Sequence, residues 1–416
     1  MIGAGLAGLA AALRLAEAGR RVVVHEAARH AGGRCRSYFD QQLGCRIDNG
    51  NHLLLSGNRS AGDYLRRLGA EDRLIGAPVP LFPFVDLATG ARWTVRPNRG
   101  RLPWWLLVPG RRVPDTRLAD YLRARRLARA SAEATVSDCL DDGGELWRRF
   151  WDPLTRAILN TAPATASARL LWATVVESFA IGGAGCRPLV AREGLSEAFV
   201  DPALARLAGA GAEVRFGQRV RVLEAAGSRI AKLRFDRDDL ALAADEAVVL
   251  AVPAWQAADL LPELAPPTAA HAIVNGHFRL EVAPDLPEGA VLLGLLGGTA
   301  EWLFIRGPVV SLTVSAADRL ADEPAPEIAR RLWRDVARAL GLPADPPPPW
   351  RIVKEKRATL AQTPEADRRR PGTRTRWPNL VLAGDWTATG LPATIEGAIR
   401  SGDRAAAALL GPPAGT

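Results

Sequence analysis

Three glycines near the beginning of the chain constrain its fold more than any other feature. Gly3, Gly5 and Gly8 form the pattern G-x-G-x-x-G, and a small-residue helix and the strand-like sequence RRVVVHE follow them. In this pattern the first glycine permits a tight turn, the second lets the backbone approach a pyrophosphate, and the third lets the helix pack closely on a sheet. Glu26 ends the strand, where a carboxylate can accept both hydroxyls of an adenosine ribose. The pattern predicts a dinucleotide-binding unit.

Two interpretations of this region stay open. A strand normally precedes such a glycine turn, and here only Met1 and Ile2 stand before Gly3. Either the start of the chain was assigned several residues late, or the first strand is shortened. The competing interpretation of the glycines is a turn in a small-residue helix, with Glu26 merely exposed.

Composition excludes several classes of protein. The chain has 416 residues, 48% of them hydrophobic and 24% charged, which is typical of a globular protein of two or three domains. Its four cysteines show no CxxC spacing and its five histidines no paired helical register, so we expect no metal site. The net charge of +9 comes from arginines that are spread along the chain and mixed with acids, which disfavours nucleic-acid binding. With no apolar run of 18 residues and no cationic leader, we expect a cytoplasmic protein, either free or peripheral at the inner face of the membrane.

Two further motifs carry a family resemblance. Gly32, Gly33 and Arg34 follow the first strand, and Gly384 and Asp385 stand in the sequence LAGDW near the other end of the chain. These segments resemble the flavoproteins of the amine-oxidase and carotenoid-desaturase group. The resemblance implies FAD as the cofactor, with the two glycines and Arg34 at its diphosphate and Asp385 at the ribityl and diphosphate region.

The same resemblance assigns a role to the last helix. It implies that this helix points its N-terminus at the pyrimidine ring of the flavin, where a positive helix end favours the negative charge that builds up on reduction. The residues that begin this segment are Pro392, Thr394 and Ile395.

Five shorter segments narrow the resemblance to the hydroxysqualene dehydroxylase family. They are residues 48–55 (DNGNHLLL), 151–154 (WDPL), 160–161 (NT), 355–359 (EKRAT) and 390–394 (GLPAT). The resemblance implies an enzyme of squalene and hopanoid biosynthesis that uses reduced FAD to replace the hydroxyl of hydroxysqualene with hydrogen. It also implies a long-chain polyprenyl substrate and prenyl synthases of the same pathway as partners.

For the catalytic residues the sequence leaves more alternatives open than for the cofactor-binding residues. Loss of an allylic hydroxyl needs a proton donor, and the resulting delocalised cation can accept hydride from flavin N5 in a dry pocket. His52 or Asp48 can supply the proton, because the family places this segment near the flavin ring. The structural alternatives are a turn-forming Asp48 and a hydrogen-bonded core His52. Lys354 and Lys356 either place an amine near flavin N5 or lie on a solvated strand face.

The segment PWWLLVP, residues 103–109, combines aromatic residues with flanking arginines and is too short to span a membrane. Trp104 and Trp105 at the lipid interface, with arginines attracted to anionic headgroups, would give a hydrocarbon substrate a route from the membrane. A buried hydrophobic hairpin arm is an equally good interpretation.

Taken together, these features predict an α/β protein with a doubly wound, Rossmann-like FAD-binding domain and an inserted α+β substrate domain. We assign residues 1–78, 187–253 and 375–416 to the first domain and 79–186 and 254–374 to the second. Periodicity predicts helices over 116–140, 145–160 and 325–340 and strands over 214–224, 230–235 and 246–251.

Three other functions remain open. An oxidative carotenoid or terpenoid desaturase, or an amine oxidase, would share the fold, although only three tyrosines are present to build an aromatic cage for an amine. A non-catalytic, FAD-containing polyprenyl-binding scaffold is the alternative of another class.

Overall fold

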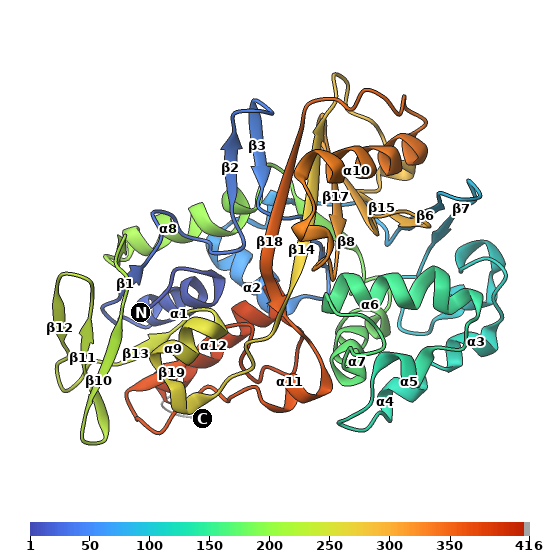
Figure 1. Ribbon diagram of the computed structural model, residues 1–416. Helices are drawn as coiled ribbons and strands as arrows, with labels where there is room; N and C mark the ends of the chain where they lie inside the picture. The colour runs from blue at the N-terminus through green and yellow to red at the C-terminus, as the bar shows by residue number, and fades with distance from the viewer. Residues whose placement is uncertain (412–416) are drawn as a thin grey trace.

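The glycine turn leads into a parallel sheet, as the sequence predicts. A computed structural model describes residues 1–411 of the chain (Figure 1). In it, β1 pairs in parallel with β9, and β13 pairs in parallel with β19. These strands are β1 (Val23–Glu26), β9 (Glu213–Phe216), β13 (Val248–Leu250) and β19 (Leu380–Leu382).

Met1 and Ile2 occupy the place of the strand that should precede the glycine turn. Ile2 bridges His25 on one side and Leu250 on the other, both in parallel. Its N–H donates to the carbonyl of Val249 and its own carbonyl accepts from the N–H of Ala251, at 2.9 and 2.8 Å. Burial lowers the pKa of the Met1 ammonium to about 6. On the other side, toward β1, the carbonyl of Met1 accepts from the N–H of His25 at 2.9 Å and the N–H of Gly3 donates to the carbonyl of His25 at 2.8 Å, so residues 1–3 join the two halves of the sheet.

The two faces of this sheet have different covers. On one face three helices, α1, α8 and α12, pack against the sheet with Val24, Val249 and Val381 in their common core, and α2 packs on α12 and α8. On the other face Leu250 and Leu382 pack against a three-stranded antiparallel sheet, β10–β11–β12. The helices are α1 (Leu6–Glu17), α2 (Arg59–Leu68), α8 (Asp201–Gly209) and α12 (Ile395–Leu410), and the strands are β10 (Val222–Ala226), β11 (Arg229–Arg234) and β12 (Asp239–Ala241).

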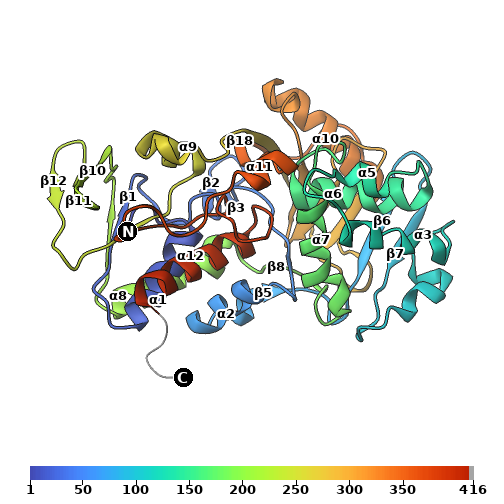
Figure 2. The same cartoon turned by 90° about the horizontal axis from the view of Figure 1, so that it is seen from below.

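Helices α1 and α12 lie side by side although they come from opposite ends of the chain (Figure 2). A Cβ atom on Gly402 of α12 would lie 2.2 Å from the carbonyl oxygen of Ala7 in α1. Only glycine permits so close an approach of two helix backbones. The glycine turn and the C-terminal motif are thereby brought to the same end of the sheet.

A second sheet has seven strands in the order β18-β14-β17-β16-β15-β6-β7, and only the β15–β6 pair in it is parallel. Its strands come from residues 82–95 and 270–360. They are β6 (Phe82–Asp86), β7 (Arg92–Val95), β14 (Ala270–Arg279), β15 (Leu292–Leu296), β16 (Trp302–Arg306), β17 (Val309–Val314) and β18 (Trp350–Leu360).

Helices cover this second sheet on both faces. Helix α10 (Ala325–Leu340) packs its apolar side against Val274 and Leu312, and the opposite face packs against a group of short helices. That group consists of α3 (Leu118–Leu122), α4 (Arg125–Ala128), α5 (Val136–Leu140), α6 (Asp152–Leu159) and α7 (Ala168–Glu177). The remaining elements are α9 (Ala254–Leu260), α11 (Pro364–Arg368), β2 (Ser37–Asp40), β3 (Cys45–Asp48), β4 (Leu54–Leu55), β5 (Leu74–Ile75) and β8 (Pro188–Ala191).

Most of the predicted elements are confirmed, and two have wrong boundaries. The helix over 325–340 is present with those limits as α10. The predicted helix over 116–140 is three short helices, and α5 begins separately with Thr135 and Asp138 in a capping box. The predicted strand over 214–224 is two strands, because Gly217 adopts a φ of 70° and turns the chain out of the parallel sheet.

The structure is an α/β fold that combines a parallel nucleotide-binding sheet with a larger mixed sheet. Between residues 1 and 411 no helix is both long and apolar enough to cross a membrane.

Candidate functional site

The glycine turn and the following Gly32-Gly33 segment lie against each other. Gly5 bridges Gly32 in parallel, and the N–H of Gly32 donates to the carbonyl of Ala4 at 2.8 Å. Gly3 and Gly33 have positive φ angles of 99° and 58°. A Cβ on Gly5 would have no atom of residues 1–411 within 4 Å, so the space beside its backbone is open. This is the property that a pyrophosphate-binding turn requires.

Glu26 lies at the end of β1 and already faces this turn. Its carboxylate accepts from the N–H of Ala4 at 2.7 Å and from the N–H of Ala28 at 2.8 Å. Each of its two oxygens therefore has one backbone donor, which fixes the carboxylate and leaves further lone pairs for the hydroxyls of a ribose.

Arg34 and Asp385 form an ion pair although they are 351 residues apart. Arg34 Nη2 lies 2.7 Å from Asp385 Oδ2, and Arg34 Nη1 donates to the carbonyl of Ala358 in β18 at 2.6 Å. Burial opposes the charge on Arg34, but Asp385 and Glu355 outweigh it and raise the pKa of the guanidinium. The two motifs that carry the family resemblance therefore meet at one point, and β18 joins them there.

The start of α12 is held by a residue that the sequence analysis missed. Gln362 Oε1 accepts from the N–H of Ala393 at 2.7 Å, and its Nε2 donates to the carbonyl of Leu159 at 2.9 Å. Thr394 caps the helix by accepting from the N–H of Gly397. No local signal in the sequence marks Gln362, because its partners come from distant segments. The predicted cofactor residues Pro392, Thr394 and Ile395 lie in this fixed turn.

His52 makes a hydrogen bond within its own segment. Its Nδ1 lies 2.9 Å from the carbonyl oxygen of Gly50, so this nitrogen carries the proton. Burial is the main cause that lowers the pKa of His52, and Arg34 lowers it further, while the Gly50 carbonyl and Asp48 raise it. The ring is therefore neutral at pH 7, with its Nε2 free of a proton.

Asp48 is buried and receives hydrogen bonds from three groups. Ser37 Oγ and the N–H of Leu195 donate to Oδ1 at 2.6 and 3.0 Å, and Arg306 forms an ion pair with Oδ2. All three hydrogen bonds use Asp48 as an acceptor. They fix the beginning of the segment that carries His52.

Residues 354–359, which include the EKRAT segment, form part of β18 and place Lys354 and Lys356 on one side of the strand and Glu355 on the other. Lys354 Nζ donates to the carbonyl of Glu323, and Lys356 Nζ lies 2.9 Å from Asp322. Glu355 lies between them and faces the other way, where its Oε2 accepts from Asn49 Nδ2 at 3.3 Å. Of the two interpretations of the lysines, the geometry favours the solvated strand face. The alternation of a strand could have identified Glu355 as the inward residue.

One row of side chains begins at Asn51, in the segment 48–55, and runs across the second sheet. Asn51 Nδ2 donates to Thr313 Oγ1 at 2.9 Å, and Trp302 is the cross-strand partner of Thr313. Phe84 follows at 5.6 Å between ring centroids from Trp302, and Trp93 at 5.6 Å from Phe84. The row changes from polar to aromatic within the width of the sheet.

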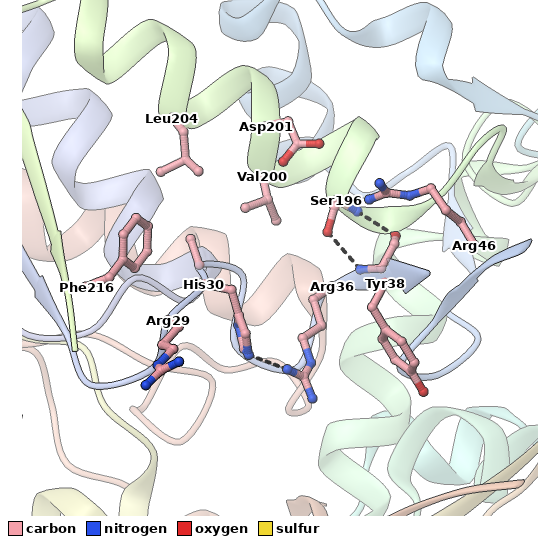
Figure 3. Close-up of a pocket in the computed structure, with 12 residues that line it drawn as sticks. Arg29, His30, Arg36, Tyr38, Arg46, Ser196, Val200, Asp201, Leu204 and Phe216 are labelled. Atoms are coloured by element: carbon pink, nitrogen blue, oxygen red, sulfur yellow. Dashed lines mark hydrogen bonds between the residues drawn. The ribbon is translucent and has the colours of Figure 1, made fainter. Parts of the chain in front are cut away.

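A cavity of about 380 Å³ borders the loop that follows Glu26 (Figure 3). Arg29, Arg36 and Arg46 line it together with a single acid, Asp201. Ser37 and Ser196 close one side with a reciprocal pair of hydrogen bonds, drawn as dashed lines in Figure 3. The arginines give this cavity a positive charge that suits an anionic group.

Comparisons with known proteins show the family of this chain. The family described as "Flavin containing amine oxidoreductase" matches residues 6–410. The chain therefore belongs to the flavin-containing amine oxidoreductase family, and it is an FAD-dependent oxidoreductase.

Relatives and solved structures extend the comparison over nearly the whole chain. Hydroxysqualene dehydroxylase from Rhodopseudomonas palustris is 49% identical over 99% of this chain and 97% of that protein. Hydroxysqualene dehydroxylase from Zymomonas mobilis is 42% identical over 98% of this chain and 97% of that protein. Cyclohexylamine oxidase from Brevibacterium oxydans shares the fold with a TM-score of 0.72, at 18% identity, and covers 98% of this chain and 97% of its own.

We propose that the residues predicted from the sequence hold the FAD. The open space at Gly5, the ribose-facing Glu26 and the Arg34–Asp385 pair fit its diphosphate and adenosine. Gly384, with a φ of 149°, contributes the turn before Asp385, because a Cβ there would lie 2.3 Å from Trp386 Nε1.

Replacing Asp385 tests this assignment. We expect Asp385→Asn to weaken FAD retention about tenfold or more, because the amide keeps the shape but leaves Arg34 without its ionic partner. The measurement is the ratio of flavin to protein absorbance after gel filtration. Asp403→Asn is the control, since Asp403 pairs with Arg14 at 2.8 Å away from the glycine turn. Equal flavin content in Asp385→Asn and the parent would contradict the assignment.

Proposed function

We propose that this protein reduces hydroxysqualene to squalene by removing its allylic hydroxyl, with reduced FAD as the hydride donor. The observation that supports this most strongly is the similarity to hydroxysqualene dehydroxylases over nearly the full length of both chains. Reduced FAD supplies hydride through N5 when it is bound. The protein itself has to bind an apolar chain, deliver a proton to the hydroxyl and exclude water. Supply of the substrate by prenyl synthases of the same pathway is part of this proposal.

The row across the second sheet supports an apolar substrate that carries one polar group. At one end Thr313 and Asn275 share a hydrogen bond of 2.9 Å next to Asn51. At the other end Trp302 and Trp93 are buried within a cluster of apolar and aromatic side chains. In this proposal the hydrocarbon lies toward the aromatic end and the hydroxyl toward His52.

His52 is our proposed proton donor for the leaving hydroxyl. Its Nδ1–H is committed to the Gly50 carbonyl, so only Nε2 can carry a transferable proton. The proton moves from Nε2 of the imidazolium to the hydroxyl oxygen, and the carbon–oxygen bond breaks with release of water. Asp48 acts through this residue, because its negative charge raises the pKa of His52 and its hydrogen bonds hold the segment.

Lipid analysis tests the proposed reaction. We expect the FAD-loaded protein, incubated without oxygen with a chemical reductant and hydroxysqualene, to form squalene that mass spectrometry detects in the extracted lipids. The controls omit either the protein or the reductant. Unchanged hydroxysqualene in the presence of reducible FAD would favour an oxidative desaturase instead. Bound FAD that cannot be reduced reversibly and supports no terpenoid turnover would favour a scaffold.

A change of pH tests His52. Because its pKa lies below 6.5, the imidazolium fraction grows as the pH falls, and we expect the single-turnover rate to rise from pH 8 to pH 6. His52→Gln is expected to lower this rate about a hundredfold and to abolish the pH dependence. The control is His271→Gln, because His271 pairs with Asp318 and has no contact with Gly50. A variant that keeps the rate within a few-fold, with the same pH dependence, would argue against proton donation.

We also propose that residues 102–108 touch a membrane surface. Leu102, Trp104 and Leu107 are 81%, 49% and 65% exposed. Arg111 lies over the ring of Trp104 at 4.7 Å. Trp105, by contrast, packs edge-on against Tyr121, and Asn98 accepts a hydrogen bond from its N–H. Exposed apolar side chains beside arginines suit an interface with anionic lipid, and Trp104 is the better lipid anchor of the two tryptophans.

Vesicle binding tests this surface. We expect the double variant Trp104→Ser, Leu107→Ser to co-sediment several-fold less with vesicles of anionic lipid, because it loses exposed apolar area without disturbing the Trp105–Tyr121 contact. Val282→Ser, which alters a 78% exposed side chain in the loop after β14, is the control. Binding of the double variant that equals the parent would remove this part of the proposal.

A further inference from the structure

Glu355 is a charged side chain that the cofactor assignment does not use. It stands in β18 where the register with β14 slips: Thr359 pairs with His271, and Glu355 pairs with Ile273. The intervening residues of β18 form a bulge. This bulge turns the carbonyl of Ala358 toward Arg34 and leaves Glu355 on the side of Asn49.

Glu355 and His52 are both coupled electrostatically to Arg34. The negative charge of Glu355 is one of the causes that raise the pKa of Arg34, and the positive charge of Arg34 is one of those that lower the pKa of His52. Asn49, three residues before His52, donates from its Nδ2 to Glu355 at 3.3 Å, and its Oδ1 accepts from Arg36. Glu355 therefore lies beside the segment that carries the proposed proton donor.

The carboxylate of Glu355 has fewer hydrogen-bond and ion-pair partners than the other acids of the site. Within residues 1–411 it accepts a single side-chain hydrogen bond, from Asn49, and no cationic nitrogen lies within 4 Å. Asp48 and Asp385 each have an arginine partner, and Glu26 has two backbone donors. Glu355 is half-buried, so its charge acts at short range without an ion pair to cancel it.

We infer that Glu355 is a catalytic residue whose carboxylate faces the substrate carbon that loses its hydroxyl and stabilises the positive charge that develops there. This inference rests on the proposed function. When the protonated hydroxyl leaves as water, the bonding electron pair leaves with it, and the allylic fragment is cationic until hydride from reduced flavin arrives. A fixed negative charge in a dry site lowers the energy of that cation more than it lowers the energy of the neutral alcohol. Glu355 gains and loses no proton in this step.

A charged analogue measures this effect without turnover. The probe is a C30 isoprenoid chain with an ammonium group in place of the carbinol carbon, and squalene is the neutral reference. In the FAD-loaded, oxidised protein we expect the ammonium chain to bind about tenfold more tightly than squalene. The change in flavin absorbance on titration measures both affinities. Glu355→Gln should make the affinities for the ammonium chain and for squalene nearly equal. The affinity for squalene itself should change less than threefold.

Three further variants make the test specific. Glu355→Asp keeps the charge and should restore most of the preference for the ammonium chain. Lys356→Gln alters the neighbouring side chain that faces Asp322, and should keep the full preference. In single turnover with reduced flavin, we expect Glu355→Gln to lower the rate about a hundredfold while Lys356→Gln remains at the parental rate. Flavin content and melting temperature of each variant verify that it is folded.

The outcomes separate this inference from the proposed function. A parent protein with no preference for the ammonium chain, or a Glu355→Gln variant that keeps the preference, would overturn the role of Glu355. A loss of preference that is equally large in Lys356→Gln would also overturn it. Failure to form squalene in a protein that still prefers the ammonium chain through Glu355 would instead overturn the proposed reaction.

Discussion

The ion pair between Arg34 and Asp385 is the interaction on which the site depends. It is largely buried, with 9% of the Asp385 side chain exposed, and removal of either partner leaves a charge without compensation. Arg34 also donates to the carbonyl of Ala358, so three segments that are far apart in the chain converge on one guanidinium. The planar fork of arginine makes this possible, because its donors point in fixed and different directions.

The second sheet has a polar end and an aromatic end. Polar groups gather on the strands next to residues 48–52, and aromatic groups gather on the strands farther away. Gly294 makes the transition possible, because a Cβ there would lie 2.3 Å from the ring of Phe84. His277 stays neutral inside the sheet, since burial lowers its pKa to about 4 while its Nδ1 pairs with Ser311. The sheet therefore offers a graded surface with few buried charges, which suits a largely apolar ligand.

Sequence periodicity located the elements better than it located their ends. Helix α10 was predicted with its observed limits, because its apolar side repeats regularly and Gly341 ends it in the left-handed conformation. Alternation over 214–224 predicts one strand, because alternation does not show a change of sheet and only the φ of Gly217 marks the turn. Trp104 and Trp105 are adjacent and alike in sequence, yet the packing of Tyr121 against one of them gives the two residues different surroundings.

The sequence by itself determined the class of protein and predicted the cofactor residues that we propose, because glycines that permit close backbone approach are a local requirement of binding a dinucleotide. It could not decide which groups from other segments the charged side chains of the site meet. That decision rests on strand register: the bulge in β18 turns Glu355 toward Asn49 and Lys356 toward Asp322. Asp48 pairs with Arg306 from a distant segment and accepts from the nearby Ser37, while the local hydrogen bond of His52 to the Gly50 carbonyl leaves its Nε2 free. The contacts of Asp48 with Arg306 and of Glu355 with Asn49 join residues 258 and 306 positions apart, and such contacts exist only once the chain has folded.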